Sequence, residues 1–423
     1  MAIALLNKFG TQEYAKDIFK FAIFSHRWGD REPLFQEMTS KVLPRSIPSG
    51  PGYDKLRHLC EKAQTDFQCR YVWSDTCCIN KESSSELEEA LRSMYRWYSL
   101  ANICIVHLGQ SLTVDDFERD PWFTRGWTLQ ELLAPPMIRF YGQDWNPICA
   151  QVHKHGDKDN EVITRAITRV TGIPEIHVRR FHPSCELVAE IMTWSATRKT
   201  TRIEDGAYAL LGLFNITIPI AYGEGHRAFY RLMVALANEC LTPSFFAWAG
   251  HHSDYSNALP ASPACYARVG PDAQAIGQSG DAGHPLYQVT KLGVVVNLLV
   301  FRVHRKLTLR GGFHVGTTWS FDEDVPLDPF VIRAGTGAAL PPFVAIEAED
   351  DHEYALGVVN FACPEPDGHG ELMRGRRYFG ILMMKSKWGW EKLSTDLVIS
   401  LNCSGDTRRP VENILLLHTV VGY

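Results

Sequence analysis

The sequence predicts an α/β fold in which a parallel sheet flanked by helices is followed by a smaller β-rich C-terminal domain. Two observations support this fold class. Within the first 141 residues, four short apolar runs alternate with segments whose apolar residues recur at helical spacing. From about residue 286 onward, short strand-like runs are separated by Gly and Pro turns. Alternating strands and helices favour a parallel sheet with right-handed crossovers.

The strands of the parallel sheet are expected where short runs are rich in strand-forming residues. They are Phe21 to Ser25, Tyr71 to Ser74, Asn102 to Leu108 and Met137 to Tyr141. A helical stripe on residues 53–67 separates the first two strands. A second stripe, on residues 87–98, follows a capping-box signal at Ser83 to Ser85. A helical extension is expected after Trp145, with stripes on residues 162–170, 187–194, 200–214 and 229–240.

The length of 423 residues exceeds the usual size of a single hydrophobic core, so two domains are expected. Residues 1–240 form the α/β domain in this prediction. Residues 241–285, which are rich in Pro, Ser, Gly and His, form a linker or irregular segment. Residues 286–423 form the β-rich accessory domain. Its strands are expected at 286–290, 294–301, 306–310, 343–347, 354–359, 378–384 and 396–400.

Composition narrows the range of function classes. The formal net charge of -5 provides no basic field for nucleic acid. The eleven cysteines lack paired C-x-x-C spacing, so neither a zinc site nor a disulfide framework is expected, and no other metal site is indicated. We interpret them as reduced thiols of a cytoplasmic protein. The most apolar run, 292–301, is too short to span a bilayer, and residues 1–6 lack the basic region of a secretion signal.

The segment from Asp120 to Pro136 combines aromatic residues, charges and a double proline in a way that core packing rarely requires. If residues 123–134 form a helix, Trp127 and Glu131 are one turn apart and share a face. A carboxylate then stands beside an indole. The alternative is structural, with Glu131 capping the helix or pairing with a neighbouring arginine.

Polar residues also follow the first two strands directly. Ser25, His26 and Asp30 lie at the end of the first strand, and Asp75 begins the loop after the second. Ligands gather at the carboxyl ends of strands in α/β sheets, because the loops there place polar groups above an apolar sheet. These residues are therefore candidates for a binding site.

Four ordered motifs together resemble the fungal heterokaryon-incompatibility (HET) domain. They are FAIFSHRWGD at 21–30, YVWSDTCCINK at 71–81, WFTRGWTLQELLAP at 122–135, and TTRIEDGAYALLGLF with IAYGEGHRAFYRLM within 200–233. The resemblance covers the chain to about residue 240. Lys81 departs from the family pattern, which usually has glutamine there.

The HET family is itself similar to TIR domains, so the resemblance implies a TIR-like sheet. The stretch from Arg125 to Leu132 resembles the helix that carries the catalytic glutamate of TIR NAD+ hydrolases, which places Glu131 at the catalytic position. Arg125 stands where that pattern has serine. The implied reaction cleaves the nicotinamide glycosidic bond of NAD+, which would be a substrate and not a bound cofactor.

A single carboxylate suits this chemistry, because it can stabilise the positive charge that builds on the ribose carbon. Nicotinamide leaves as a neutral molecule, so a general acid is dispensable. The candidate contacts to the dinucleotide are the aromatic residues Trp28 and Trp127, which can stack on a flat ring, and the polar residues Ser25, His26, Asp30 and Asp75. The alternative interpretation places each aromatic residue in the core.

Two classes of function fit the resemblance. The first is an NAD+-consuming effector of programmed cell death in fungal innate immunity. The second is a non-enzymatic death-signalling module that acts by self-association. Self-association is expected in both cases, together with a protein partner in non-self recognition. Loss of NAD+ from a lysate on expression distinguishes the two classes, because an adaptor leaves NAD+ unchanged.

Overall fold

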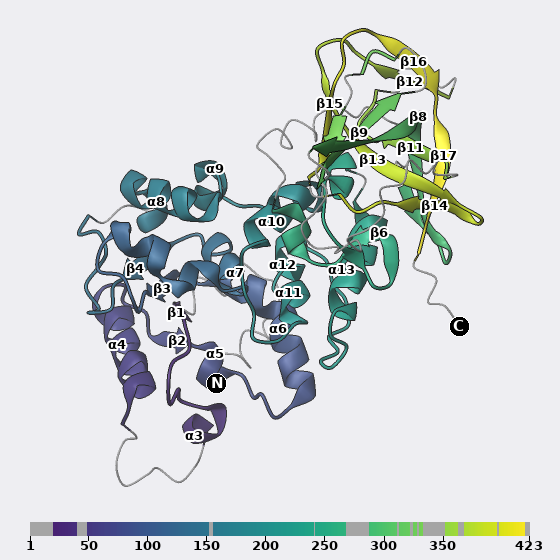
Figure 1. Cartoon of the computed structure of the whole chain (residues 1–423). Coiled ribbons are helices and arrows are strands. Elements are labelled where there is room, and N and C mark those ends of the chain that lie inside the picture. Colours follow the sequence, from purple (N-terminus) through teal and green to yellow (C-terminus); the bar gives the residue numbers. More distant parts are fainter. Residues whose placement is uncertain are drawn as a thin grey trace. The chain divides into compact units, whose positions relative to one another are not determined.

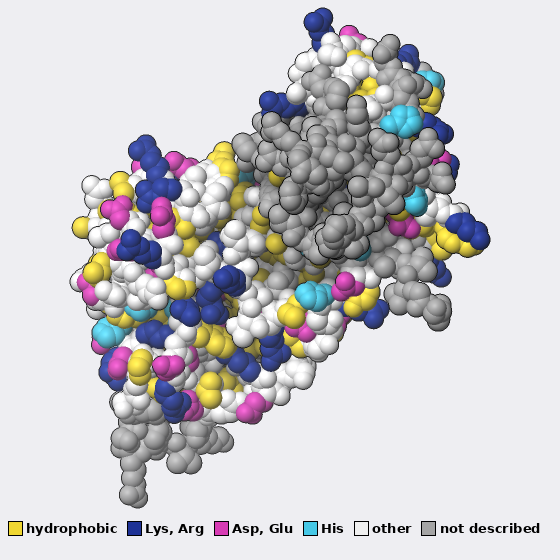
Figure 2. Space-filling model, viewed as in Figure 1, with side chains coloured by type: hydrophobic (Ala, Val, Ile, Leu, Met, Phe, Trp, Pro, Cys, Tyr) yellow, Lys and Arg dark blue, Asp and Glu magenta, His cyan; other side chains and the backbone are white. Residues whose placement is uncertain are grey.

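A computed structural model describes residues 20–39, 49–151, 155–240, 242–267, 287–310, 313–321, 325–327, 330–332, 352–362, 368–395 and 397–418. The chain divides into two compact units (Figure 1), and Figure 2 shows the same view with side chains coloured by type. The first contains residues 1–183 and 198–220, and the second contains residues 184–197 and 221–423. The domain limits at residues 240 and 285 stay a prediction. Among the described residues, no helix is long and apolar enough to cross a membrane.

The first unit is built on a sheet of four parallel strands in the order β2-β1-β3-β4. The strands are β1 (Phe21–His26), β2 (Tyr71–Trp73), β3 (Ile103–His107) and β4 (Ile138–Tyr141). They coincide with the four apolar runs, so the prediction of a parallel α/β sheet is confirmed. Ser25 pairs with Val106 and His26 with His107, which brings the carboxyl ends of β1 and β3 together. The strand order reverses at β1, because β2 and β3 lie on opposite sides of it.

Helices cover both faces of this sheet. Helix α4 (Pro51–Thr65) packs Leu59 and Ala63 against Ala22 and Phe24 of β1. Because successive side chains of a strand point to opposite faces, Ser25 faces the other side. Helix α6 (Ser84–Leu100) lies on that side, and its Tyr98 donates a 2.7 Å hydrogen bond to the carbonyl oxygen of Phe24. The α6 helix begins where the Ser83 hydroxyl accepts a hydrogen bond from the Glu86 amide, as its capping signal predicts.

The helix that carries Glu131 is shorter than residues 123–134. A 3-10 turn, η2 (Pro121–Thr124), comes first, and α7 spans only Thr128–Leu133. The helix cannot extend further back, because the backbone on either side of Arg125 is already bonded elsewhere. The amide of Lys199 donates to the Thr124 carbonyl at 2.7 Å, and the amide of Gly126 donates to the Lys199 carbonyl at 2.9 Å. A Cβ on Gly126 would come within 2.4 Å of Thr200, so this approach requires glycine.

The remaining helices of the first unit are short. The predicted stripe on residues 200–214 forms two helices, because the Leu210 amide bonds three residues back to Ala207 and interrupts the α-helical ladder. The helices are α3 (Phe35–Thr39), α5 (Asp75–Cys78), η1 (Val114–Arg119), η3 (Asp157–Asp159), α8 (Glu161–Thr171), α9 (Glu175–Arg179), α11 (Asp205–Tyr208) and α12 (Leu211–Phe214).

The second unit combines helices with a larger sheet. Its first elements are η4 (Cys185–Leu187), α10 (Val188–Ser195), α13 (Arg227–Glu239), η5 (Pro243–Phe246), β5 (His252–Ser253), β6 (Ser256–Pro260) and η6 (Pro263–Tyr266). The described part of the predicted linker, 242–267, thus contains short regular elements, and Phe245 is fully buried. Residues 268–285 lie outside the described residues.

The C-terminal region is β-rich, as predicted. A mostly antiparallel sheet runs in the order β10-β9-β8-β11-β13-β14-β17, with β7 and β15 pairing at its sides. A separate two-stranded sheet is formed by β12 and β16. The strands of the region are β7 (Tyr287–Val289), β8 (Gly293–Arg310), β9 (Phe313–Phe321), β10 (Phe330–Ile332), β11 (Tyr354–Val358), β12 (His369–Leu372), β13 (Arg377–Ser386), β14 (Gly389–Lys392), β15 (Ile399–Asn402), β16 (Thr407–Pro410) and β17 (Glu412–Leu417). The two predicted strands at 294–301 and 306–310 are parts of β8. The predicted strand at 343–347 lies outside the described residues.

Candidate functional site

The side chains of Ser25 and Glu131 meet at the carboxyl end of β1. The Ser25 hydroxyl donates a hydrogen bond of 2.5 Å to Oε2 of Glu131. Both residues are buried, with 0% of Ser25 and 7% of Glu131 exposed. The alternation of β1 places Ser25 on the face covered by α6 and α7, and α7 carries Glu131. A serine and a glutamate far apart in sequence therefore share one buried site.

Trp122 fixes the direction of this hydrogen bond. Its indole Nε1 lies 2.8 Å from the Ser25 Oγ, and Trp122 is fully buried. An indole N–H can only donate, so the Ser25 oxygen accepts from Trp122. The Ser25 proton is then directed to Glu131. Trp122 is positioned by Asp120, whose side chain accepts from the Trp122 amide at 3.0 Å.

The environment of Glu131 disfavours its charged form. Burial, followed by the nearby negative charge of Asp75, raises the pKa of Glu131 to about 8. The hydrogen bond from Ser25, the charge of Arg125 and the nearby Tyr98 hydroxyl act in the opposite direction. In the described part of the chain, Glu131 forms no ion pair with an arginine. A carboxyl group with a perturbed pKa at a sheet edge is typical of functional sites.

Asp75 connects Glu131 to the loop after β1. It begins α5, and its Oδ2 accepts a 2.8 Å hydrogen bond from the indole of Trp28. Trp28 is 42% exposed, which is unusual for a tryptophan with a fixed orientation. The ammonium group of Lys81 lies 3.7 Å from the centroid of the Trp28 ring. The predicted residues Trp28 and Asp75 are thus in direct contact.

His26 and Asp30 lie apart from the Ser25 and Glu131 pair. The His26 ring stacks on Phe24 at 4.0 Å, on the face of the sheet covered by α4. Its Nε2 lies 3.5 Å from Glu32. Asp30 is exposed in the turn after β1. Burial alone would raise the pKa of Glu32, but His26, Lys55 and the Gly29 amide lower it to about 2. Glu32 therefore anchors the loop that carries Trp28.

Trp127 lies at the beginning of α7 and is partly buried. Its carbonyl accepts the amide of Glu131 at 3.4 Å, so the two residues are one helical turn apart, as predicted. Arg198 secures the same end of α7. It donates to the Arg125 carbonyl at 2.8 Å and to the Thr128 hydroxyl at 3.0 Å.

Three residues of the site did not belong to the predicted set. Trp122 lies within the segment 120–136, but its contact with Ser25 depends on the fold of η2. Tyr98 belongs to the buried stripe of α6. The sequence does not distinguish a tyrosine whose hydroxyl lies near Glu131 from one that only packs in the core. Arg198 follows 67 positions after Glu131, and no local spacing points to it. Among the described residues, no cluster of three or more His, Cys, Asp or Glu side chains could hold a metal ion.

Comparison with known proteins gives a family match that lies within the first unit. Residues 21–119 match the family described as "Heterokaryon incompatibility protein (HET)". The chain is 40% identical over 218 residues to "Vegetative incompatibility protein HET-E-1" of Podospora anserina. This similarity covers 48% of the chain and 15% of the relative, so the chain spans a small part of that protein. No solved structure matches the chain. The match to this family thus includes Ser25, Trp28 and Asp75 and ends before Glu131.

Proposed function

We propose that this chain is a cell-death effector of the heterokaryon-incompatibility type that hydrolyses NAD+ at the nicotinamide glycosidic bond, with Glu131 as the catalytic residue. The observation that carries the proposal is the hydrogen bond between Ser25 and Glu131 at the carboxyl end of β1. In parallel sheets, ligands bind outside this end, where the strand order reverses. The site therefore joins a carboxyl group suited to the reaction with the usual position of a ligand.

The reaction requires a negative charge near the ribose. As the bond from C1′ to the nicotinamide nitrogen breaks, its electron pair returns to the ring, nicotinamide leaves as a neutral molecule, and positive charge develops at C1′. Ionised Glu131 stabilises that charge. Water then forms the new bond to C1′, and loss of its proton gives ADP-ribose. The Ser25 hydroxyl supports the ionised form by donating a hydrogen bond to Oε2.

The raised pKa of Glu131 is compatible with this role. With a pKa of about 8, the carboxyl group of the free protein is mostly protonated at neutral pH. The nicotinamide ring of NAD+ carries a positive charge, so its binding nearby favours ionisation. The substrate itself then brings Glu131 into its active form.

We also propose that the sheet is TIR-like and that the predicted polar and aromatic residues contact the dinucleotide. The order β2-β1-β3-β4 is that of flavodoxin-like sheets as far as it extends, and such sheets bind ligands at the β1 and β3 ends. Trp28 supplies an exposed ring whose N–H is held by Asp75. Trp127 stands one turn before Glu131. His26 and Asp30 would contribute from the β1 end.

The cell-death role is inferred from the HET domain and from the relative, whose name assigns it to vegetative incompatibility. A non-enzymatic signalling module that acts by self-association is the alternative. The observation that favours that alternative is the burial of Glu131, because a buried and hydrogen-bonded carboxyl group also suits a purely structural role.

The decisive experiment compares purified wild-type protein with Glu131→Gln at matched melting temperature. Gln keeps the size of the side chain but cannot carry the negative charge. Nicotinamide release from NAD+ should fall by at least about two orders of magnitude, because a focused charge is worth several kcal/mol. Equal activity in the two proteins contradicts the assignment of Glu131. If the concentrated wild type releases no nicotinamide, the signalling alternative replaces the enzymatic one.

A further inference from the structure

The C-terminal end of α7 lacks the backbone donors that normally complete a helix. The helix ends at Leu133, and Pro135 and Pro136 follow at once. In a longer helix, the amides of these two positions would bond to the carbonyls of Glu131 and Leu132, but proline has no N–H. All six residues of α7 are buried, so water is a poor substitute donor. Donors from other parts of the chain must therefore complete this end.

Lys158 supplies donors to two neighbouring carbonyls at this end of the helix. Its ammonium group donates to the Pro135 carbonyl at 2.7 Å and to the Leu133 carbonyl at 3.2 Å. The thiol of Cys104 makes a longer contact, 3.8 Å, with the Glu131 carbonyl. Only 1% of Lys158 is exposed. Burial lowers the pKa of Lys158 to about 7, because a buried environment disfavours the charged ammonium form.

The backbone of Lys158 is itself held in place from two sides. On one side, Asp157 accepts from the Phe140 amide and from Arg139, both at 2.7 Å, and so ties η3 to β4. On the other side, Arg179 donates to the Lys158 carbonyl at 3.2 Å.

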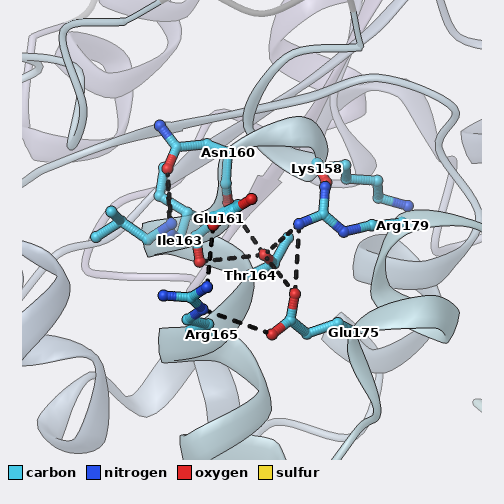
Figure 3. A network of polar contacts seen from close by, with 9 residues as sticks. Lys158, Asn160, Glu161, Ile163, Thr164, Arg165, Glu175 and Arg179 are labelled. Carbon is cyan, nitrogen blue, oxygen red and sulfur yellow. Dashed lines mark hydrogen bonds and ion pairs between the residues drawn. The ribbon is translucent and has the colours of Figure 1, made fainter.

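A polar network fixes Arg179 in turn (Figure 3). Arg179 of α9 also donates to Thr164 of α8 at 3.1 Å, which joins the two helices, and to Glu175 of α9 at 3.3 Å. Asn160 caps α8 by accepting from the amides of Val162 and Ile163. Figure 3 shows the Lys158 side chain pointing away from this network. The network thus holds the backbone of Lys158 in place, and the Lys158 side chain extends from there to the end of α7.

We propose that Lys158 is a positioning residue for Glu131, because its ammonium group donates to the carbonyl of Leu133, the last residue of the helix that carries the carboxyl group, and to the carbonyl of Pro135. A six-residue helix has little stability of its own, so its orientation depends on contacts such as these. A displacement of about 1 Å in a catalytic group can cost up to a hundredfold in rate. The catalytic consequence rests on the proposed function, whereas the placement of α7 by Lys158 does not.

The experiment compares Lys158→Met, which keeps the volume without a donor, with Lys158→Gln, which keeps an N–H donor without the charge. For nicotinamide release, kcat should fall at least about tenfold in Lys158→Met, with KM nearly unchanged because Lys158 does not touch the substrate. Lys158→Gln should recover most of the loss. Arg165→Met is the matched control, because Arg165 belongs to the outer part of the same network with 69% of its side chain exposed. Its kcat should equal that of the wild type.

Two results would overturn the inference. One is a wild-type kcat in Lys158→Met. The other is equal activity of the Met and Gln variants, which would mean that Lys158 only fills space. If the wild type itself releases no nicotinamide, the proposed function fails. Hydrogen exchange then tests whether Lys158 positions α7. The amides of Glu131 and Ala134, which bond within α7, should exchange at least about tenfold faster in Lys158→Met but not in Lys158→Gln or Arg165→Met. Unchanged exchange in Lys158→Met would reject the positioning role.

Discussion

The hydroxyl of Ser25 lies 2.5 Å from Oε2 of Glu131, although 106 positions separate the two residues in sequence. The Trp122 indole occupies the acceptor side of the hydroxyl, so Ser25 acts as a donor toward the carboxyl group. The hydrogen bonds among the three residues therefore run in one direction, from the Trp122 indole through the Ser25 hydroxyl to the Glu131 carboxyl group. Changes to Ser25 or Trp122 should therefore affect the carboxyl group of Glu131.

We expect Ser25→Ala to lower nicotinamide release about tenfold to a hundredfold. A hydrogen bond to a charged group is worth about 1.5–3 kcal/mol, and each ~1.4 kcal/mol corresponds to a factor of ten in rate. The variant should also be active only at higher pH, because the Ser25 hydrogen bond lowers the pKa of Glu131. Steady-state rates measured across pH test both effects.

Trp122→Phe serves as the comparison for Ser25→Ala. It removes the indole N–H but leaves the Ser25 hydroxyl free to rotate, so a smaller loss is expected. A loss in Trp122→Phe that exceeds the loss in Ser25→Ala would mean that Trp122 acts mainly through packing.

A second prediction concerns Asp75 and the pH dependence of the reaction. If the carboxylate is the active form, kcat/KM should rise with pH to a midpoint near 8, the pKa of Glu131 in the free protein. The charge of Asp75 contributes to that high pKa. Asp75→Asn removes a like charge and should therefore move the midpoint to lower pH.

Trp28→Phe is the matched control for this shift. It removes the hydrogen bond between Trp28 and Asp75 but keeps the charge of Asp75. The midpoint should not move to lower pH in this variant. A profile that is flat from pH 6 to 9 in the wild type would show that the ionisation of Glu131 does not control the rate.

Much of the fold of the first unit could be predicted from sequence, because its strands are short apolar runs buried on both faces. Ser25 and Asp75 could be proposed from sequence because they lie at the carboxyl end of such a strand, and Glu131 because of the unusual segment 120–136. The start of α7 depends on backbone bonds to Lys199, and its end depends on Lys158, so neither boundary is visible in residues 120–136. His26 illustrates a further limit. It follows Ser25 directly, and the alternation of the strand turns its ring to the opposite face.

A third prediction concerns the free energy of unfolding, so its test does not require enzymatic activity. The pKa of Glu131 is about 8 in the folded chain, against an ordinary value of 4.5. Between these values the folded chain keeps a proton that the unfolded chain has released. The corresponding stability is present below about pH 4.5 and is lost as the pH rises toward 8. Each pKa unit is about 1.4 kcal/mol, so the loss is on the order of 5 kcal/mol at most.

Glu131→Gln does not titrate and should lack this dependence. Denaturant unfolding of both proteins at several pH values between 5 and 8 measures the difference in their free energies of unfolding. We expect the wild type to lose stability relative to Glu131→Gln as the pH increases. A constant difference would mean that the carboxyl group of Glu131 has an ordinary pKa in the folded protein.

The final prediction is that activity requires self-association. In the proposed TIR-like arrangement, a neighbouring copy of the chain completes the site, so the rate per molecule should rise with protein concentration. This expectation agrees with the burial of Glu131, because a residue that is only 7% exposed in the single chain must become more accessible before a dinucleotide can reach it. Nicotinamide release measured over a hundredfold range of concentration, with the oligomeric state followed by light scattering, tests the prediction. Glu131→Gln controls for background hydrolysis at each concentration. A monomer whose specific activity is independent of concentration would show that one chain holds the complete site and that opening of α7 alone admits the substrate.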